Sequence, residues 1–524
     1  MLALLCGYGS GVRVALGQRG GRQCLHWTSK KSSGPTVAKG RLENDPYEVA
    51  RKVSAFLKKH DYDRALRLVE SKARDVSMAD KYTVSWNRLI QYNMKTGKMS
   101  TAWKVYHEMK RRGQRIDSYT HAHLFLGLQR NVHFKTAAAG ALKLWNTLCA
   151  SMGPLGAETI HGNAMLHIAW KTKDMVTFWD IVNTMSQSKK KCLQPDTATY
   201  TIILSVLCDN AIANPNRAEE HVSQGKQIWE EIMKKWAEGS VHMDGKLAST
   251  FCQLLLSGQQ PNDFDSVFSV IQDVYGIQRI KAPLEHVLPR LTSRIIPLVP
   301  ETRILKSLLI ACRKFRQKNV AQSYWSVFVN FYKVTPDLPA THIMIKLLAD
   351  TRDSGAALDL IQETQSRGIE LAPLTVYLAL HACRRSANFE DALQVIALSQ
   401  KCDIEISAKL MFTLLKVADT TEDEKIYLQA LELVASLPMH VLGPDSASMN
   451  VLAMVKKLRN SIKRVDFLLF KDGYMKAFFE ENEKMWLRYG SVVDPSEGLT
   501  VSMEREAADD AALDNGILEN RYAV

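Results

Sequence analysis

One stretch of 35 residues, Thr83 to Asp117, decides the fold: TVSWNRLIQYNMKTGKMSTAWKVYHEMKRRGQRID. Apolar residues over 84–94 recur at mixed spacings of three and four, which is the pattern of an amphipathic helix. Gly97 ends this helix, and a second helix with its own apolar stripe follows from Met99. Gly113, directly after a basic turn, supplies a C-terminal cap. The stretch therefore predicts a helix-turn-helix hairpin.

The same register recurs along the chain, so the hairpin is predicted to be a repeat. Met185 lies 22 residues after Asn163, as Met109 does after Asn87. The second helices share a column of alanines, whose small side chains allow close packing: Ala65, Ala102, Ala141, Ala321, Ala357 and Ala392. These anchors place about ten hairpins, with starts near residues 46, 83, 118, 159, 197, 245, 302, 338, 373 and 408.

Stacked hairpins of this kind predict an all-α fold, a right-handed α-solenoid. Four prolines interrupt the pattern, so we expect a break at 279–300 between helical blocks at 42–278 and 301–455. Residues 456–493 are predicted to form capping helices, because the ends of a solenoid need atypical units. Residues 494–524 are acidic and are predicted to be a disordered tail.

The first 41 residues have the composition of a mitochondrial presequence. They carry seven basic residues and no acidic one, and they are rich in Gly, Ser and small apolar residues. A disordered basic terminus of a cytosolic protein is the alternative. The nine cysteines never fall in a C-x-x-C spacing, which favours buried thiols in a reducing compartment such as the mitochondrial matrix. No apolar run approaches the roughly 20 residues of a membrane-spanning helix, so membrane insertion is not expected.

The chain has a net charge of +13, and its basic start and acidic tail enclose a moderately basic body. Such a body would attract phosphate backbones, although a solvated lysine-rich surface explains the same charge. No G-x-x-x-x-G-K-S/T loop or H-E-x-x-H motif occurs, and His121 and His123 are two apart on a predicted helix, facing different ways. We therefore predict no cofactor, no metal and no enzyme; a nuclease would need a carboxylate cluster that the sequence does not display.

The hairpin at residues 83–117 closely resembles the pentatricopeptide repeat. The residues that carry the resemblance are Trp86, Asn87, Arg88, Leu89, Ile90, Gly97, Ala102, Met109, Gly113 and Asp117. The match is partial at Asp196–Thr201 and Thr341–Met344, and it becomes degenerate from residue 245 onward. A tetratricopeptide unit is the nearest alternative, and Asn87 after Trp86 with a closing Asp favours the pentatricopeptide repeat.

The resemblance implies that each repeat offers two side chains to one base of a single-stranded RNA, one from its first helix and one from its closing residue. An amide can donate and accept at a Watson–Crick edge, and a neighbouring carboxylate can orient it. Carried over residue by residue, Asn87 with Asp117 and Asn163 with Asp196 resemble pyrimidine readers, and Thr201 with Asp244 resembles a guanine reader.

The same column departs from the family's preferred residues elsewhere, at Ala122, Lys306, His342 and Tyr377, while Ser249 keeps a hydroxyl. Base reading is expected to be weak at these departures. Lys306 could still contact a phosphate, and Tyr377 could stack on a base.

The resemblance thus predicts a mitochondrial matrix adaptor that binds a single-stranded mitochondrial RNA, either rRNA or mRNA, in processing, stability or translation. The chain is similar to fungal-type members with degenerate repeats, which often serve small-subunit ribosomal RNA maturation. The resemblance therefore makes that RNA the first expected target, and the small ribosomal subunit or its precursors an expected partner. The alternative is a helical protein-binding scaffold for mitochondrial ribosome or respiratory-complex assembly, which the poor later repeats favour.

Overall fold

The computed structural model describes residues 45–72, 81–133, 135–150, 156–280, 298–435, 450–451, 453–455 and 457–458. The regular secondary structure in these ranges is helical, and they contain no β-strand. None of the helices in these ranges is long and apolar enough to cross a membrane. The expected presequence at 1–41, the tail at 494–524 and nearly all of the predicted cap at 456–493 lie outside the described residues.

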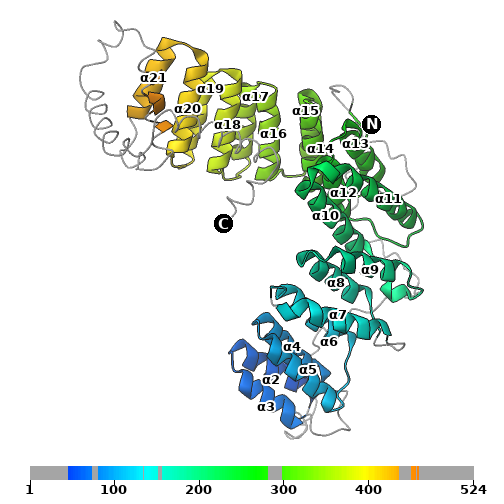
Figure 1. Cartoon of the computed structure of the whole chain (residues 1–524). Helices are drawn as coiled ribbons and strands as arrows, with labels where there is room; N and C mark the ends of the chain where they lie inside the picture. The colour runs from blue at the N-terminus through cyan, green and yellow to red at the C-terminus, as the bar shows by residue number, and fades with distance from the viewer. Residues whose placement is uncertain are drawn as a thin grey trace, which may run out of the picture. The chain divides into compact units, whose positions relative to one another are not determined.

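The chain divides into two compact units, residues 1–127 and 128–524, and the division falls inside helix α6 (Ser118–Arg130). The first unit holds two complete hairpins, formed by α2 (Pro46–Lys58) with α3 (Tyr62–Lys72) and by α4 (Thr83–Lys95) with α5 (Met99–Arg111). Each second helix contacts its own first helix, and α2 also contacts α4. The first helices therefore form one layer and the second helices another (Figure 1).

The second unit continues the pattern after α7 (Lys135–Ala150). Its first helices are α8 (Thr159–Lys171), α10 (Thr197–Ala213), α12 (Gly245–Ser257), α14 (Thr302–Lys314), α16 (Leu338–Asp350), α18 (Pro373–Ser386) and α20 (Ala408–Thr421). Its second helices are α9 (Met175–Ser186), α11 (Ala218–Ala237), α13 (Pro261–Tyr275), α15 (Lys318–Ser326), α17 (Ser354–Ser366), α19 (Phe389–Lys401) and α21 (Glu424–Ala435). Each first helix contacts the next, from α8 to α20, and the paired second helices line the other side (Figure 1).

The predicted hairpins are confirmed over the described residues. The ten first helices begin at 46, 83, 118, 159, 197, 245, 302, 338, 373 and 408, as the repeat register predicts. Gly97 and Gly113 both take positive φ, 74° and 65°, and end α4 and α5 as expected of left-handed caps. The alanine column is buried, with each of its six side chains at most 1% exposed. Those alanines therefore fix how closely each second helix approaches its neighbours.

The predicted break at 279–300 lies mostly outside the described residues, since 281–297 are not described. Helix α14, which follows it, contacts both α12 and α13, which precede it. The Ile280 N–H donates to the Tyr324 hydroxyl at 3.0 Å, and the Leu298 N–H donates to the Val274 carbonyl at 3.2 Å. The stack is thus continuous in its helix contacts here, and the division into two blocks at this place stays a prediction.

Candidate nucleic-acid interface

Two residues of each hairpin unit define the candidate site. We call the fifth residue of each first helix the reading position, and the residue just before the next first helix the closing residue. In the first compact unit, the Asn87 Nδ2 donates to the Asp117 Oδ1 at 3.1 Å. Asp117 also accepts the Thr120 backbone N–H at 2.8 Å, which caps the start of α6. The Asp117 carboxylate therefore both accepts a hydrogen bond from the Asn87 amide and caps the N-terminus of α6.

The same arrangement recurs in the second compact unit. The Asn163 Nδ2 donates to the Asp196 Oδ1 at 3.1 Å, and Asp196 accepts the Thr199 backbone N–H at 2.8 Å. Asn163 is half-buried and Asp196 is exposed, so the polar ends of this pair reach solvent. The structure thus brings the two residues together in two of the three pairs that the sequence predicts.

The third nominated pair, Thr201 and Asp244, is arranged differently. The Thr201 hydroxyl donates to the Thr197 carbonyl of its own helix at 2.8 Å. Asp244 accepts the Leu247 N–H at 2.7 Å and so caps α12. The described contacts include no hydrogen bond between the two side chains. Because the Thr201 hydroxyl hydrogen is already used, that oxygen offers a ligand an acceptor rather than a donor.

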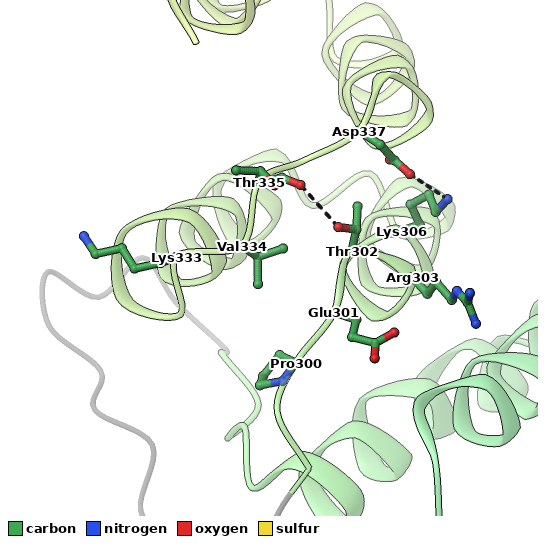
Figure 2. A pocket seen from close by; sticks show the side chains of 9 residues that line it. All are labelled: Pro300, Glu301, Thr302, Arg303, Lys306, Lys333, Val334, Thr335 and Asp337. Carbon is green, nitrogen blue, oxygen red and sulfur yellow. Dashed lines mark hydrogen bonds and ion pairs between the residues drawn. The ribbon is translucent and has the colours of Figure 1, made fainter. Parts of the chain in front are cut away.

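An ion pair replaces the amide–carboxylate pair at α14, where the Lys306 Nζ lies 3.1 Å from the Asp337 Oδ2. Figure 2 shows the two side chains turned toward each other at the rim of a pocket of about 450 Å³. Its lining residues are Pro300, Glu301, Thr302, Arg303, Lys306, Lys333, Val334, Thr335 and Asp337. With three cations and two carboxylates, this pocket is suited to a polar ligand that carries negative charge.

The reading position of α16 is a buried neutral histidine. His342 is 6% exposed, and its Nε2 lies 2.8 Å from the Thr375 Oγ1. Burial, together with the charge of Lys346 and against the opposing charge of Asp337, lowers the pKa of His342 to about 4. The imidazole is therefore uncharged at neutral pH and its Nε2 is engaged inside the stack.

Acidification is expected to destabilise the second unit through His342. Its folded pKa of about 4 lies below the ordinary 6.5, so the unfolded chain binds more protons between those values. The stability contribution is complete above pH 6.5 and falls as the pH drops toward 4, by up to about 3 kcal/mol. Urea unfolding of the wild type and of His342→Gln across this range tests it. The variant should lose less stability on acidification, and equal losses would contradict the assignment.

The last two reading positions are aromatic and covered. Tyr377 is 9% exposed, and the Lys409 Nζ lies 4.8 Å from its ring centroid. Phe412 is 4% exposed, with the Lys416 Nζ 4.5 Å from its ring centroid. The ring faces are therefore taken up by packing and by ammonium groups, and Tyr377 has little surface left on which a base could stack.

One feature near the reading positions was missed from the sequence. The second residue of four first helices is a large apolar side chain that stays exposed: Tyr47 at 75%, Val84 at 53%, Tyr119 at 72% and Ile160 at 50%. Each stands three residues before the reading position, and residues three apart lie on the same helix face. The signal was present in the sequence as one more column of the repeat. These four exposed side chains therefore share one register and stand beside the reading position of their own helix.

No group of three or more His, Cys, Asp or Glu residues that could hold a metal occurs in the part of the chain that the structure describes.

A sequence model described as the PPR repeat family matches residues 81–130, which include α4, α5, α6 and the Asn87–Asp117 pair. The match to the PPR repeat family therefore covers this stretch of the chain. The chain is also 23% identical over 384 residues to the pentatricopeptide repeat-containing protein 2, mitochondrial, of Schizosaccharomyces pombe, an alignment that covers 70% of this chain and 83% of that protein.

Two solved structures resemble the chain at low identity, the first of them a pentatricopeptide repeat protein. Maize PPR10 gives a TM-score of 0.43 at 13% identity, covering 90% of this chain and 63% of that one. This protein thus spans less than two thirds of the PPR10 chain. Yeast Rmd9p in complex with a 16-nucleotide target RNA gives a TM-score of 0.30 at 11% identity, covering 93% of this chain and 97% of that one.

Proposed function

We propose that this protein binds single-stranded RNA in mitochondria and acts by occupying its target rather than by catalysis. The observation that carries the proposal is the recurrence of one side-chain arrangement, in which Asn87 and Asn163 each donate to a closing carboxylate at 3.1 Å. Packing within a hairpin does not require such a pair, because Ala122 occupies the same register between them. A repeated polar pair on rigid helices suits one-base-per-repeat recognition.

The hydrogen-bonding capacity left on each amide supports this function. An amide carries two N–H donors and an oxygen with two lone pairs. At Asn87 one donor is used by Asp117 and one lone pair by Thr120, which leaves one donor beside one acceptor. Uracil and cytosine each present an acceptor beside a donor on the Watson–Crick edge. The preference for pyrimidines itself comes from the family resemblance.

The exposed apolar side chains beside the reading positions offer a surface for the faces of the bases. Val84 lies on the same face of α4 as Asn87, and Ile160 lies on the same face of α8 as Asn163. A base with its edge at the amide would lay its face against such a side chain. Tyr47 and Tyr119 offer aromatic rings for the same contact, worth about 1 to 3 kcal/mol per base.

The basic pocket at α14 is proposed to hold the RNA backbone rather than to read a base. We expect Lys306→Ala to weaken RNA binding by a similar factor for all sequences, because a phosphate contact carries no sequence information. The slope of log affinity against log salt should decrease by about one. Binding titrations at several salt concentrations measure both. A change confined to one base identity would contradict the backbone assignment.

The cellular role that we propose is in the mitochondrial matrix, in RNA processing, stability or translation, with small-subunit ribosomal RNA as the first target to test. The presequence-like composition of residues 1–41 and the mitochondrial relative in Schizosaccharomyces pombe support the compartment. A matrix location would also place the protein beside the small ribosomal subunit and its precursors.

A second candidate function is a helical scaffold that grips another protein during ribosome or respiratory-complex assembly. It is favoured by the reading positions of the last three first helices, His342, Tyr377 and Phe412, none of which is an amide paired with a carboxylate. These hairpins would then bind protein while the earlier ones bind RNA.

Crosslinking of the tagged protein in isolated mitochondria, followed by sequencing of the attached RNA, tests the proposal. We expect one discrete footprint that weakens when Asn87→Ala and Asp117→Ala are combined. The pair Asp180→Ala with Asn183→Ala is the matched control, because it removes the same side-chain types from exposed positions of α9. If no RNA rises above background, the RNA-binding proposal fails and the scaffold becomes the better one.

A further inference from the structure

A third side chain joins each amide–carboxylate pair. The Thr120 Oγ1 lies 2.8 Å from the Asn87 Oδ1 and 2.7 Å from the Asp117 Oδ1. The Thr199 Oγ1 lies 2.6 Å from the Asn163 Oδ1 and 2.9 Å from an Asp196 oxygen. Both threonines are the third residue of the next first helix, and both are fully buried. Each threonine hydroxyl is therefore shielded from solvent and contacts the amide–carboxylate pair from inside the stack.

The three groups together permit one orientation of the amide. An ionised carboxylate only accepts hydrogen bonds, so the amide must turn its nitrogen toward Asp117. The Thr120 hydroxyl then donates to the amide oxygen on the other side. Rotating the Asn87 amide by half a turn would set its oxygen against the carboxylate and leave the hydroxyl facing an N–H group. The buried hydroxyl thus fixes which side of the amide presents its N–H donor and which presents its oxygen acceptor to a base.

Whether a threonine stands at this register depends on the chemical type of the residue at the reading position that it faces. Behind His342 the same register holds Thr375, whose Oγ1 is 2.8 Å from the imidazole Nε2. Where the reading position is a hydroxyl, an ammonium or a phenol, the register is apolar: Leu247 behind Thr201, Ile304 behind Ser249, Ala340 behind Lys306 and Leu410 behind Tyr377. Helix capping does not explain this, since Asp244 and Asp337 cap their helices without any such threonine.

We infer that Thr120 and Thr199 are positioning residues for base recognition, each holding a reading amide in one orientation, so that discrimination depends on three side chains. The inference rests on the proposed RNA-binding function and deepens it. Without the hydroxyl, only the carboxylate would oppose the turned amide, so the second order of donor and acceptor would cost less and the unit would discriminate less between bases.

The test uses the whole protein and a pool of single-stranded RNA of random sequence, with the bound fraction sequenced. Thr120→Val keeps the volume and the Thr120 backbone N–H but removes the hydroxyl. We expect the base preference at one nucleotide to decrease by about threefold to tenfold, the factor expected from one lost hydrogen bond. Thr199→Val should relax a different nucleotide. Thr120→Ser restores the hydroxyl and should restore the preference.

Two outcomes separate this inference from the function on which it rests. If the wild type selects RNA and Thr120→Val keeps the same preference at every nucleotide, the positioning role is wrong while RNA binding stands. If the wild type retains no RNA, the proposed function itself fails. Thr364→Val is the control for a purely structural effect, because the Thr364 hydroxyl is buried and donates to the Leu360 carbonyl of α17. It should leave every nucleotide preference unchanged.

Discussion

Replacing both reading amides, Asn87→Ala with Asn163→Ala, is expected to lower the affinity for the RNA selected by the wild type by about a hundredfold or more. Each wrong or lost base contact costs about 1 to 3 kcal/mol, and sites far apart add nearly independently. The two amides belong to different hairpins and share no hydrogen-bond partner. The loss should therefore approach the product of the two single effects, measured by titration of a labelled RNA at fixed salt.

The single variants and a control test whether this loss of affinity comes from the two amides. Each Asn→Ala change alone should cost about tenfold or more, and the RNA bearing another base opposite that unit should lose less. Asn183→Ala, on the exposed side of α9, should bind as the wild type does. A double variant that binds within a factor of about two of the wild type would mean that the amides do not touch the bases.

Trp86→Ala is expected to destabilise the first compact unit by about 3 to 5 kcal/mol. The Trp86 side chain is 0% exposed, and truncating a fully buried aromatic residue removes its transfer free energy and leaves a cavity. The indole N–H has no hydrogen-bond partner, so the cost comes from packing and from the contact with Arg112, whose guanidinium lies 5.8 Å from the ring centroid. In a repeat protein each hairpin is supported only by its neighbours, so the loss should appear as early melting of α2 to α5.

Urea unfolding followed by circular dichroism, with hydrogen exchange to locate the change, measures this effect. Val84→Ala is the neighbouring control, because Val84 is 53% exposed and such surface changes usually stay within about 0.5 kcal/mol. A loss below about 1 kcal/mol for Trp86→Ala would contradict the packing of this hairpin.

The helices of this chain could be predicted closely from the sequence because the repeat overdetermines them. An apolar stripe, a left-handed turn such as Gly97 and an alanine such as Ala102 must all fall in register, and an error in one is corrected by the next unit. The division of the chain inside α6 could not be foreseen in this way, since it depends on how many contacts cross a given point.

The candidate site was less predictable than the helices. The repeat register gives the position of a side chain, but it does not give the hydrogen-bond partner of that side chain. Thr201 and Asn163 occupy the same register, yet the Thr201 hydroxyl bonds to its own helix, as short hydroxyl side chains often do. The sequence gives no reason to assign Thr120 to the site, because a threonine near a helix start has an ordinary capping role. Its contact with Asn87 joins residues 33 apart, and only the stacked hairpins bring them together.

The closing carboxylate makes two separate contacts, one that serves folding and one that belongs to the candidate site. Asp117 accepts the Thr120 N–H at the start of α6 and the Asn87 amide, whereas Asp244 and Asp337 cap their helices beside Thr201 and Lys306. Helix capping alone is therefore a sufficient reason for an aspartate at this position. An aspartate just before a first helix marks where that helix begins, and only the residue paired with it distinguishes a unit that we propose to bind a base.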